Sequence, residues 1–157
     1  MKILGIDPGS QITGYGLVER QRNHYRHIDN GGVFTSSKDS FPDKLHTLYH
    51  GITDLILQFS PDAMAVETIF YAKNVRSALQ LAHARGVILA CGAAQKLPIF
   101  EYSPLSVKQA IVGYGRASKE QVQTMVKHLL KLPEKTFYDS SDALAVAICH
   151  LNHLKSI

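Results

Sequence analysis

The chain has 157 residues, of which 45% are hydrophobic and 19% are charged, and this balance is typical of one folded domain rather than of a disordered or fibrous chain. We therefore expect a single domain over residues 1–157. No stretch reaches the roughly 18 consecutive apolar residues of a membrane-spanning helix, and the first residues lack the pattern of a secretory signal. The expected location is the cytoplasm, without membrane attachment. The two cysteines, Cys91 and Cys149, lie far apart within apolar helical patterns, which indicates buried free thiols.

The net charge of +4 is distributed unevenly along the chain. Residues 73–135 contain ten Lys and Arg residues against three Glu residues, whereas residues 1–72 contain six basic and eight acidic residues. A basic segment of this kind favours a polyanion such as nucleic acid as partner, because each neutralised phosphate releases counterions. A solvated helical face is the alternative interpretation.

The first part of the chain has the pattern of three sequential antiparallel strands. An apolar run, Lys2–Asp7, leads through Pro8-Gly9 into an alternating segment, Thr13–Arg20, which predicts a β-hairpin. A third strand follows over His24–Thr35. We expect a bulge or a second turn within it at Asn30-Gly31-Gly32.

The rest of the chain alternates helices with two more strands. A helix capped by Ser40 ends before Pro61, and a short strand, Ala63–Glu67, suits an interior position in the sheet because it is apolar on both faces. A helix rich in small residues, Asn74–Lys96, precedes a strand over Leu97–Tyr102. Three further helices are expected. The first covers Ser103–Ile111, the second begins at Ser118 and ends before Pro133, and the third covers Tyr138–Leu154. This order predicts an α/β architecture, a mixed five-stranded sheet with helices on both faces.

Four acidic residues stand at positions where such a fold can bring them together. Asp7 and Glu67 each end an apolar strand, and Asp139 and Asp142 share one face of the opening turn of the last helix. Ligands bind at strand ends in open α/β sheets, and a pocket of carboxylates suits two Mg²⁺ ions about 4 Å apart, an arrangement that hydrolyses phosphodiesters. Simpler interpretations exist for three of the acids: a turn residue for Asp7, and an N-cap and a favourable first-turn charge for Asp139 and Asp142. Glu67 has no such simple alternative, because a charged residue that ends an apolar strand must face a partner or solvent.

Two histidine pairs invite a different metal hypothesis. His46/His50 and His150/His153 have helical pair spacing. Zinc sites generally need three or four ligands, and neither pair has a third one nearby in the sequence. We therefore reject zinc for both pairs.

Five ordered segments of the sequence resemble the RuvC family. They are Gly5-Ile6-Asp7-Pro8-Gly9 with Thr13-Gly14-Tyr15-Gly16, the run from Glu67 to Asn74, Ala84-Arg85-Gly86, Val107-Lys108-Gln109 with the run from Gly113 to Val122, and the run from Asp139 to Ala145. Together they span nearly the whole chain. The resemblance implies an RNase H-like fold and a homodimer that resolves Holliday junctions by paired symmetric nicks in DNA recombination and repair. It also implies four-way junction DNA as substrate and the RuvA–RuvB branch-migration complex as partner.

The same resemblance assigns roles to individual residues. Asp7, Glu67, Asp139 and Asp142 would be the catalytic residues and the metal ligands, with Asp7 bridging two Mg²⁺ ions per subunit and Mn²⁺ able to substitute. Four clustered carboxylates repel one another without a metal, so we expect that neutralising Asp142 raises the melting temperature in a chelator.

The resemblance also implies DNA contact by one aromatic and three basic residues: Phe70, Lys73, Lys108 and Lys119. Phe70 would stack on bases near the crossover, as exposed aromatic side chains do on unpaired bases. An ordinary core position is the alternative for Phe70.

Symmetric cutting depends on dimerisation, and we place the dimer interface on the small-residue helix Asn74–Lys96. The alternative is that the small residues of this helix pack against other parts of the same chain.

The sequence is also compatible with two rival functions: another RNase H-like nuclease and a catalytically silent junction-binding module. A third, half of an actin-like ATPase or sugar kinase, would need two such lobes, and this length supplies one.

Overall fold

A computed structural model describes residues 1–9, 11–22, 24–68, 74–132 and 138–154. The strands of this part of the chain are β1 (Lys2–Asp7), β2 (Ile12–Gln21), β3 (His24–Phe34), β4 (Ala63–Glu67) and β5 (Ile99–Tyr102). Its helices are α1 (Phe41–Phe59), α2 (Val75–Ala94), α3 (Pro104–Val112), α4 (Lys119–Leu130) and α5 (Tyr138–His153). Every predicted strand and helix is present, and the ends differ from the prediction by at most two residues.

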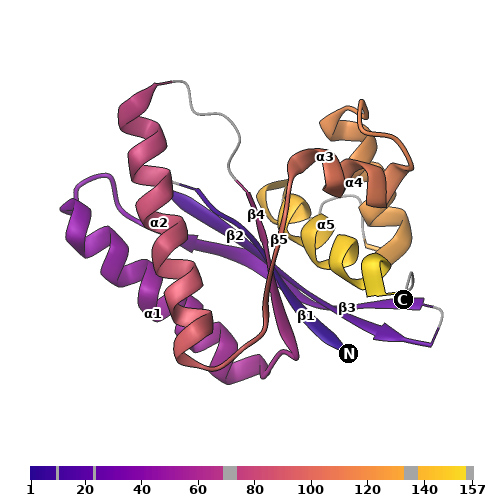
Figure 1. Ribbon diagram of the computed structural model, residues 1–157, viewed down its shortest axis with the longest axis horizontal. Helices are drawn as coiled ribbons and strands as arrows, with labels where there is room; N and C mark the ends of the chain where they lie inside the picture. Colours follow the sequence, from indigo (N-terminus) through magenta and orange to yellow (C-terminus); the bar gives the residue numbers. More distant parts are fainter. Residues whose placement is uncertain (10, 23, 69–73, 133–137, 155–157) are drawn as a thin grey trace.

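The five strands form one mixed sheet in the order β3-β2-β1-β4-β5, which confirms the predicted architecture (Figure 1). β1, β2 and β3 are sequential antiparallel neighbours, whereas β4 lies parallel to both β1 and β5. β4 therefore has a neighbour on each side, as its two-sided apolar sequence predicted. β1 occupies the centre of the sheet.

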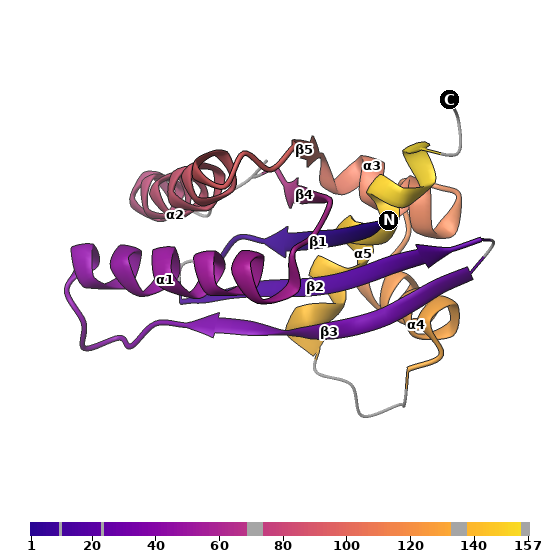
Figure 2. The same ribbon diagram turned by 90° about the horizontal axis from the view of Figure 1, so that it is seen from below.

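Helices cover both faces of this sheet (Figures 1 and 2). α1 and α2 pack on one face against alternate strand residues such as Leu4 and Ile6, and α5, with α3 and α4 beside it, packs on the other face against residues such as Ile3. These three strand side chains have no exposed surface. The residues from Ala143 to Ile148 are at most 1% exposed, so α5 is enclosed on all sides, as its continuous apolar pattern predicted.

Side-chain caps define where four helices begin. The residues at the N-caps of α1, α2, α3 and α4 each accept a hydrogen bond from the backbone N–H three residues on: Ser40, Asn74, Ser103 and Ser118. At α4 the side chain of Gln121 also accepts from the backbone N–H of Ser118, which completes the predicted capping box. These caps bind N–H groups that the helix itself leaves without partners.

The predicted break in the third strand at residues 30–32 is wrong. Asn30 and Gly31 continue the ladder opposite Gly16 and Tyr15. The irregularity lies earlier, where the register shifts between Leu17 and Val18. Glycine at position 31 serves packing, since a Cβ there would lie 2.9 Å from the Tyr15 hydroxyl group.

Two glycines set the distance between α5 and the sheet. A Cβ at Gly5 of β1 would lie 2.1 Å from the carbonyl oxygen of Ala143, and a Cβ at Gly16 of β2 would lie 2.7 Å from the backbone nitrogen of Leu144. Both clashes are with backbone atoms, which cannot rotate away. The absence of side chains at these paired positions therefore lets the first half of α5 lie directly on the sheet.

Both cysteines are buried free thiols, as predicted. Burial raises the pKa of the Cys149 thiol to about 12 and also raises the pKa of Cys91. The two thiols therefore stay protonated and unreactive at neutral pH. In the described residues, no helix has both the length and the apolar composition needed to cross a membrane.

We expect Gly5→Ala to lower the free energy of unfolding by about 1–3 kcal/mol, because the added methyl group must push α5 off the sheet. Gly115→Ala is a matched control: its Cβ would also have a neighbour at 2.1 Å, but that neighbour is the end of the exposed, flexible Leu105 side chain. The control should stay within about 0.5 kcal/mol of the wild type. Urea unfolding measures both variants, and equal losses would contradict the role given to Gly5.

Candidate active site

Asp7 and Glu67 end two adjacent parallel strands. β1 and β4 pair in register up to Ile6 and Val66, so the next residue on each strand is one of these acids. Ile6 and Val66 face α1 and α2, and alternation along a strand therefore turns Asp7 and Glu67 toward α5. The two carboxyl groups share a hydrogen bond.

The turn after Asp7 is held from the neighbouring strand. The buried Thr13 hydroxyl group donates to the carbonyl oxygen of Gly9 at 3.3 Å and accepts from the Gly9 N–H at 3.4 Å. These contacts tie the chain that leaves β1 to the start of β2. Thr13 is a supporting residue whose role the sequence alone did not indicate.

Glu67 is electrostatically unfavourable as an anion. Burial, the charge of Asp7, the hydrogen bond with Asp7 and the charge of Asp142 together raise its pKa from 4.5 to about 8, while Lys119 acts in the opposite direction. Burial is the largest of these causes. The site thus concentrates negative charge where water can screen it only partly.

Asp142 lies on α5 and pairs with Lys119 at the start of α4. The Lys119 Nζ atom is 2.6 Å from Oδ2 of Asp142, and the side chain of Asp142 is 24% exposed. The sequence suggested repulsion from the other acids and a favourable helix-end charge at Asp142, but it did not indicate this attraction to Lys119. The expectation that neutralising Asp142 raises the melting temperature therefore no longer follows, and Glu67 becomes the residue at which repulsion should be measured.

One cavity of about 220 Å³ brings acids and predicted DNA-contact residues together. Glu67, Asp142, Lys108 and Lys119 line it from β4, α5, α3 and α4, and its apolar walls are Pro104, Val107, Val122 and Ala145. Residues separated by up to 78 positions in the sequence thus share one concave site. An anionic group that enters it would meet two ammonium groups beside the carboxylates.

Three of the predicted site residues cannot be placed here. Asp139 belongs to the first turn of α5, three positions before Asp142, but its side chain lies outside the described part of the structure. Phe70 and Lys73 lie outside the described residues altogether. Their roles stay predictions.

The donor set fits a hard divalent cation. Asp7, Glu67 and Asp142 offer only carboxylate oxygens, the ligands that Mg²⁺ and Mn²⁺ prefer, and the raised pKa of Glu67 records a surplus of negative charge that a cation would offset. Among the side chains that the structure describes, no group of three His, Cys, Asp or Glu residues is close enough to hold an ion. The fit therefore rests on ligand type and charge.

Comparison with known proteins identifies the family. The family model for crossover junction endodeoxyribonuclease RuvC matches residues 3–150. The chain belongs to this family. The RuvC proteins of Geotalea uraniireducens and Trichlorobacter lovleyi are 54% and 55% identical over 152 residues, which cover 97% of this chain and 89% and 85% of theirs. The chain is accordingly an endodeoxyribonuclease, and nucleases of this family depend on a divalent metal ion.

A solved structure supports the same assignment. Thermus thermophilus RuvC in complex with a Holliday junction substrate superposes with a TM-score of 0.94 at 30% sequence identity, covering 99% of this chain and 96% of that one. The RNase H-like fold class inferred from the resemblance is thereby confirmed.

The raised pKa of Glu67 predicts how stability depends on pH. Because the folded-state pKa of about 8 lies above the ordinary value of 4.5, the folded protein holds this proton more tightly than the unfolded chain. Wild-type stability should therefore fall as the pH rises from about 4.5 to 8. In a chelator, Glu67→Gln should be more stable than the wild type at pH 9 and nearly equal to it at pH 5, as measured by urea unfolding.

Glu120→Gln is the control for this measurement. Glu120 lies in the first turn of α4, is fully exposed, and has its pKa lowered by hydrogen bonding to Ser118. Removing its charge should give no stabilisation at pH 9. A Glu67→Gln variant with the same advantage at both pH values would show that side-chain size, rather than charge, decides the effect.

Proposed function

We propose that this protein resolves Holliday junctions by cutting two opposed strands symmetrically at the crossover, with Mg²⁺ held by Asp7, Glu67, Asp139 and Asp142. The observation that carries the proposal is the cavity in which Glu67 and Asp142 lie beside Lys108 and Lys119. Family membership supplies the substrate class, since a relative of the same fold has been solved in complex with a Holliday junction.

The acidic and basic groups of the site have distinct tasks in strand cleavage. The carboxylates would hold two Mg²⁺ ions per subunit, for which Mn²⁺ could substitute; when bound, these ions would activate a water molecule and stabilise the leaving oxygen. Asp7 and Glu67 come from rigid neighbouring strands, and Asp142 comes from the buried helix packed on them, so the donor set is fixed before substrate arrives. No side-chain nucleophile is needed.

Lys108 and Lys119 would guide the scissile phosphate into the cavity. Both are cationic residues of helices that border the cavity, and the Lys119 side chain is 59% exposed while its ammonium group pairs with Asp142. A phosphate that enters can compete for this ammonium group and draw it from the carboxylate. Lys119 would then serve both states of the site: it offsets the charge of Asp142 before substrate binds and the charge of the phosphate afterwards.

A catalytically silent junction-binding module is the second candidate, and the charge distribution argues against it. A binding surface gains nothing from burying Glu67 beside Asp7, which raises the pKa of Glu67 to about 8. Such a cost is typical of catalytic sites. Another RNase H-like nuclease would share the acids, and substrate preference separates it from a resolvase.

Three further parts of the proposal rest on the family resemblance. Phe70 and Lys73, between β4 and α2, would contact the bases and phosphates near the crossover. The RuvA–RuvB complex would supply the junction, and action on chromosomal junctions places the protein in the cytoplasm. All remain predictions.

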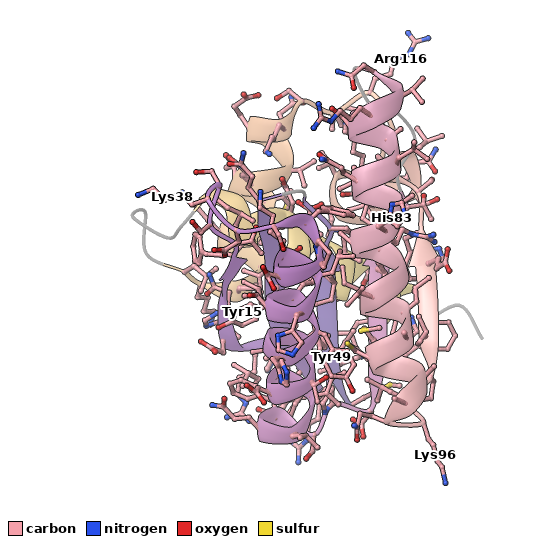
Figure 3. All side chains as sticks on the ribbon, turned by 90° about the vertical axis from the view of Figure 1, so that its left-hand side faces the viewer. Tyr15, Lys38, Tyr49, His83, Lys96 and Arg116 are labelled. Carbon is pink, nitrogen blue, oxygen red and sulfur yellow. The ribbon has the colours of Figure 1, made fainter. Side chains whose placement is uncertain are left out.

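The homodimer has support on the surface of α2. This helix exposes apolar residues at spacings of three or four: Val75, Leu79, Ala82, Gly86 and Ala90. Val75 and Leu79 are 77% and 56% exposed, and they belong to one continuous apolar stripe rather than standing singly. Figure 3 shows the face of the molecule that is formed by α1 and α2, which lies opposite the layer of α3, α4 and α5. A second copy packed on this stripe would cover it.

Asp7→Asn should leave junction affinity nearly unchanged and bring strand cleavage to background, because affinity comes from phosphate contacts and chemistry from the acids and metal. Labelled four-way junction and linear duplex of the same sequence, incubated with Mg²⁺ and read on a denaturing gel, measure cleavage; gel shift in Ca²⁺ measures binding. Asp54→Asn, an exposed acid on α1, is the control. Equal cutting of duplex and junction by the wild type would favour the general nuclease.

Leu79→Lys should convert the dimer into a monomer, as measured by sedimentation equilibrium, because two buried ammonium groups would face each other across the interface. On a plasmid-borne cruciform the variant should produce mostly single nicks, whereas the wild type should produce linear DNA by paired nicks. Leu57→Lys on α1, with 60% exposure, is the matched control and should behave as the wild type. A dimeric Leu79→Lys protein would exclude this interface without touching the activity proposal.

A further inference from the structure

A second cavity lies at the end of α4 that points away from the acids. It measures about 660 Å³ and opens between the β2–β3 hairpin and the C-terminal end of α4. Its lining carries five basic or imidazole side chains: His24, Arg26, His27, His128 and Lys131. Among the described residues that line it, none is acidic. An open, basic cavity of this size suits an anionic ligand.

We propose that this cavity binds the phosphate backbone of a junction arm, several base pairs from the cleavage site. The inference rests on the proposed function and adds a contact that neither the acids nor the predicted DNA-contact residues provide. The occupant is duplex DNA, recognised by its phosphates rather than by its bases.

The length of α4 sets the distance between the active-site cavity and this second cavity. This helix has 12 residues, so it measures about 18 Å from Lys119 at its start to the cavity at its end. At 3.4 Å per base pair, 18 Å corresponds to about five base pairs of duplex. An arm that leaves the active site along α4 would therefore present backbone phosphates to the cavity five to seven base pairs from the cut.

The surface between the two sites suits a polyanion. After Glu120, the exposed residues of α4 are Gln121, Thr124 and His128, none of which is acidic. The one acidic residue of the helix, Glu120, lies in its first turn. No carboxylate follows Glu120 on the exposed side of the helix, which ends at Lys131.

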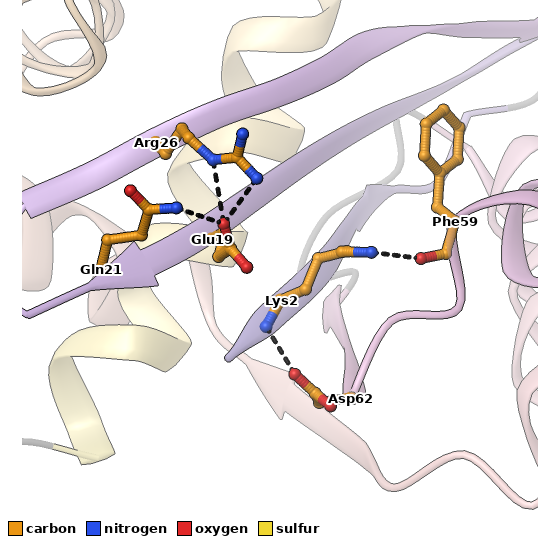
Figure 4. Close-up of polar contacts among 6 residues, drawn as sticks. All are labelled: Lys2, Glu19, Gln21, Arg26, Phe59 and Asp62. Carbon is orange, nitrogen blue, oxygen red and sulfur yellow. Dashed lines mark hydrogen bonds and ion pairs between the residues drawn. The ribbon is translucent and has the colours of Figure 1, made fainter.

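The side chain of Arg26 is held in one orientation at the cavity. Its guanidinium group is held by Glu19, with Nη2 at 2.7 Å and Nε at 2.9 Å from the same carboxylate oxygen, while the Arg26 side chain remains 56% exposed (Figure 4). Gln21 also donates to that oxygen at 2.9 Å. The pair fixes the guanidinium plane on β3, and an arginine so oriented loses less entropy when it binds a phosphate.

The test combines a protein variant with a chemically altered junction. In Arg26→Gln/Lys131→Asn, two cations of the cavity are removed; asparagine is chosen because Lys131 has a left-handed backbone with φ 54°. The control is Lys38→Gln/Lys96→Asn, which removes two exposed lysines elsewhere (Figure 3), the second with nearly the same φ of 55°. The junctions carry either natural phosphates or neutral methylphosphonates five to seven base pairs from the cut.

In Ca²⁺, the cavity variant should bind the natural junction about tenfold or more weakly, and the slope of log affinity against log salt should fall by about 1.8 for each protomer that engages an arm. Methylphosphonates should weaken wild-type and control binding to a similar degree but should not weaken the cavity variant further. With Mg²⁺ and saturating junction, the cleavage rate of the cavity variant should equal that of the wild type.

Three outcomes would overturn the inference. The cavity variant could bind the natural junction like the control, in which case the cavity serves another anion, such as an acidic protein surface. The losses from the variant and from the methylphosphonates could add in full, which would mean that they act at different places. Cleavage at saturation could fall, which would make these residues part of the catalytic machinery. A wild type that neither binds nor cuts junctions would instead refute the proposed function.

Discussion

The direct contact between α5 and two glycines of the sheet is the constraint on which the site depends. Because Gly5 and Gly16 have no side chains, the backbone of α5 around Ala143 and Leu144 lies against β1 and β2. Asp142 precedes these residues directly, so the height of the helix above the sheet also sets the distance from its carboxylate to Glu67. A sheet that carried alanine at these positions would hold the same residues and lose the arrangement that gives them a shared cavity.

Bringing the acids together removes part of their hydration and makes their charges repel. The fold reduces this electrostatic cost in two ways. The hydrogen bond between Asp7 and Glu67 needs a proton, which the raised pKa of Glu67 retains at neutral pH. Lys119 supplies a positive charge at Asp142 from a different helix. The capping box at Ser118 and Gln121 fixes the start of α4 and thereby the position from which Lys119 reaches. A local feature of the sequence thus contributes to the electrostatics of a site formed by four elements.

Periodicity and turn residues were sufficient to predict the strands, the helices and their layers, because each element carries its own signal. The position of the irregularity in β3 was not predictable, since Gly31 looks the same whether it ends a strand or makes room for Tyr15. The convergence of Glu67 and Asp142 was foreseeable from strand ends and helix spacing. The ion pair with Lys119 was not, because nothing local relates the first residue of α4 to the first turns of α5; only the packing of the two helices brings them together.

α4 connects the cavity beside the acids with the basic cavity. Its first residue, Lys119, faces the acids, and its last turn reaches the basic cavity beside the β2–β3 hairpin. A rigid helix between a chemical site and a binding site fixes their separation, and a duplex has a fixed rise per base pair. A duplex that lies along the helix from the acids would match the two lengths. An enzyme that selects a branched structure rather than a sequence has to recognise the direction in which arms leave the crossover, and a contact set at a fixed distance from the cut does so without reading any base.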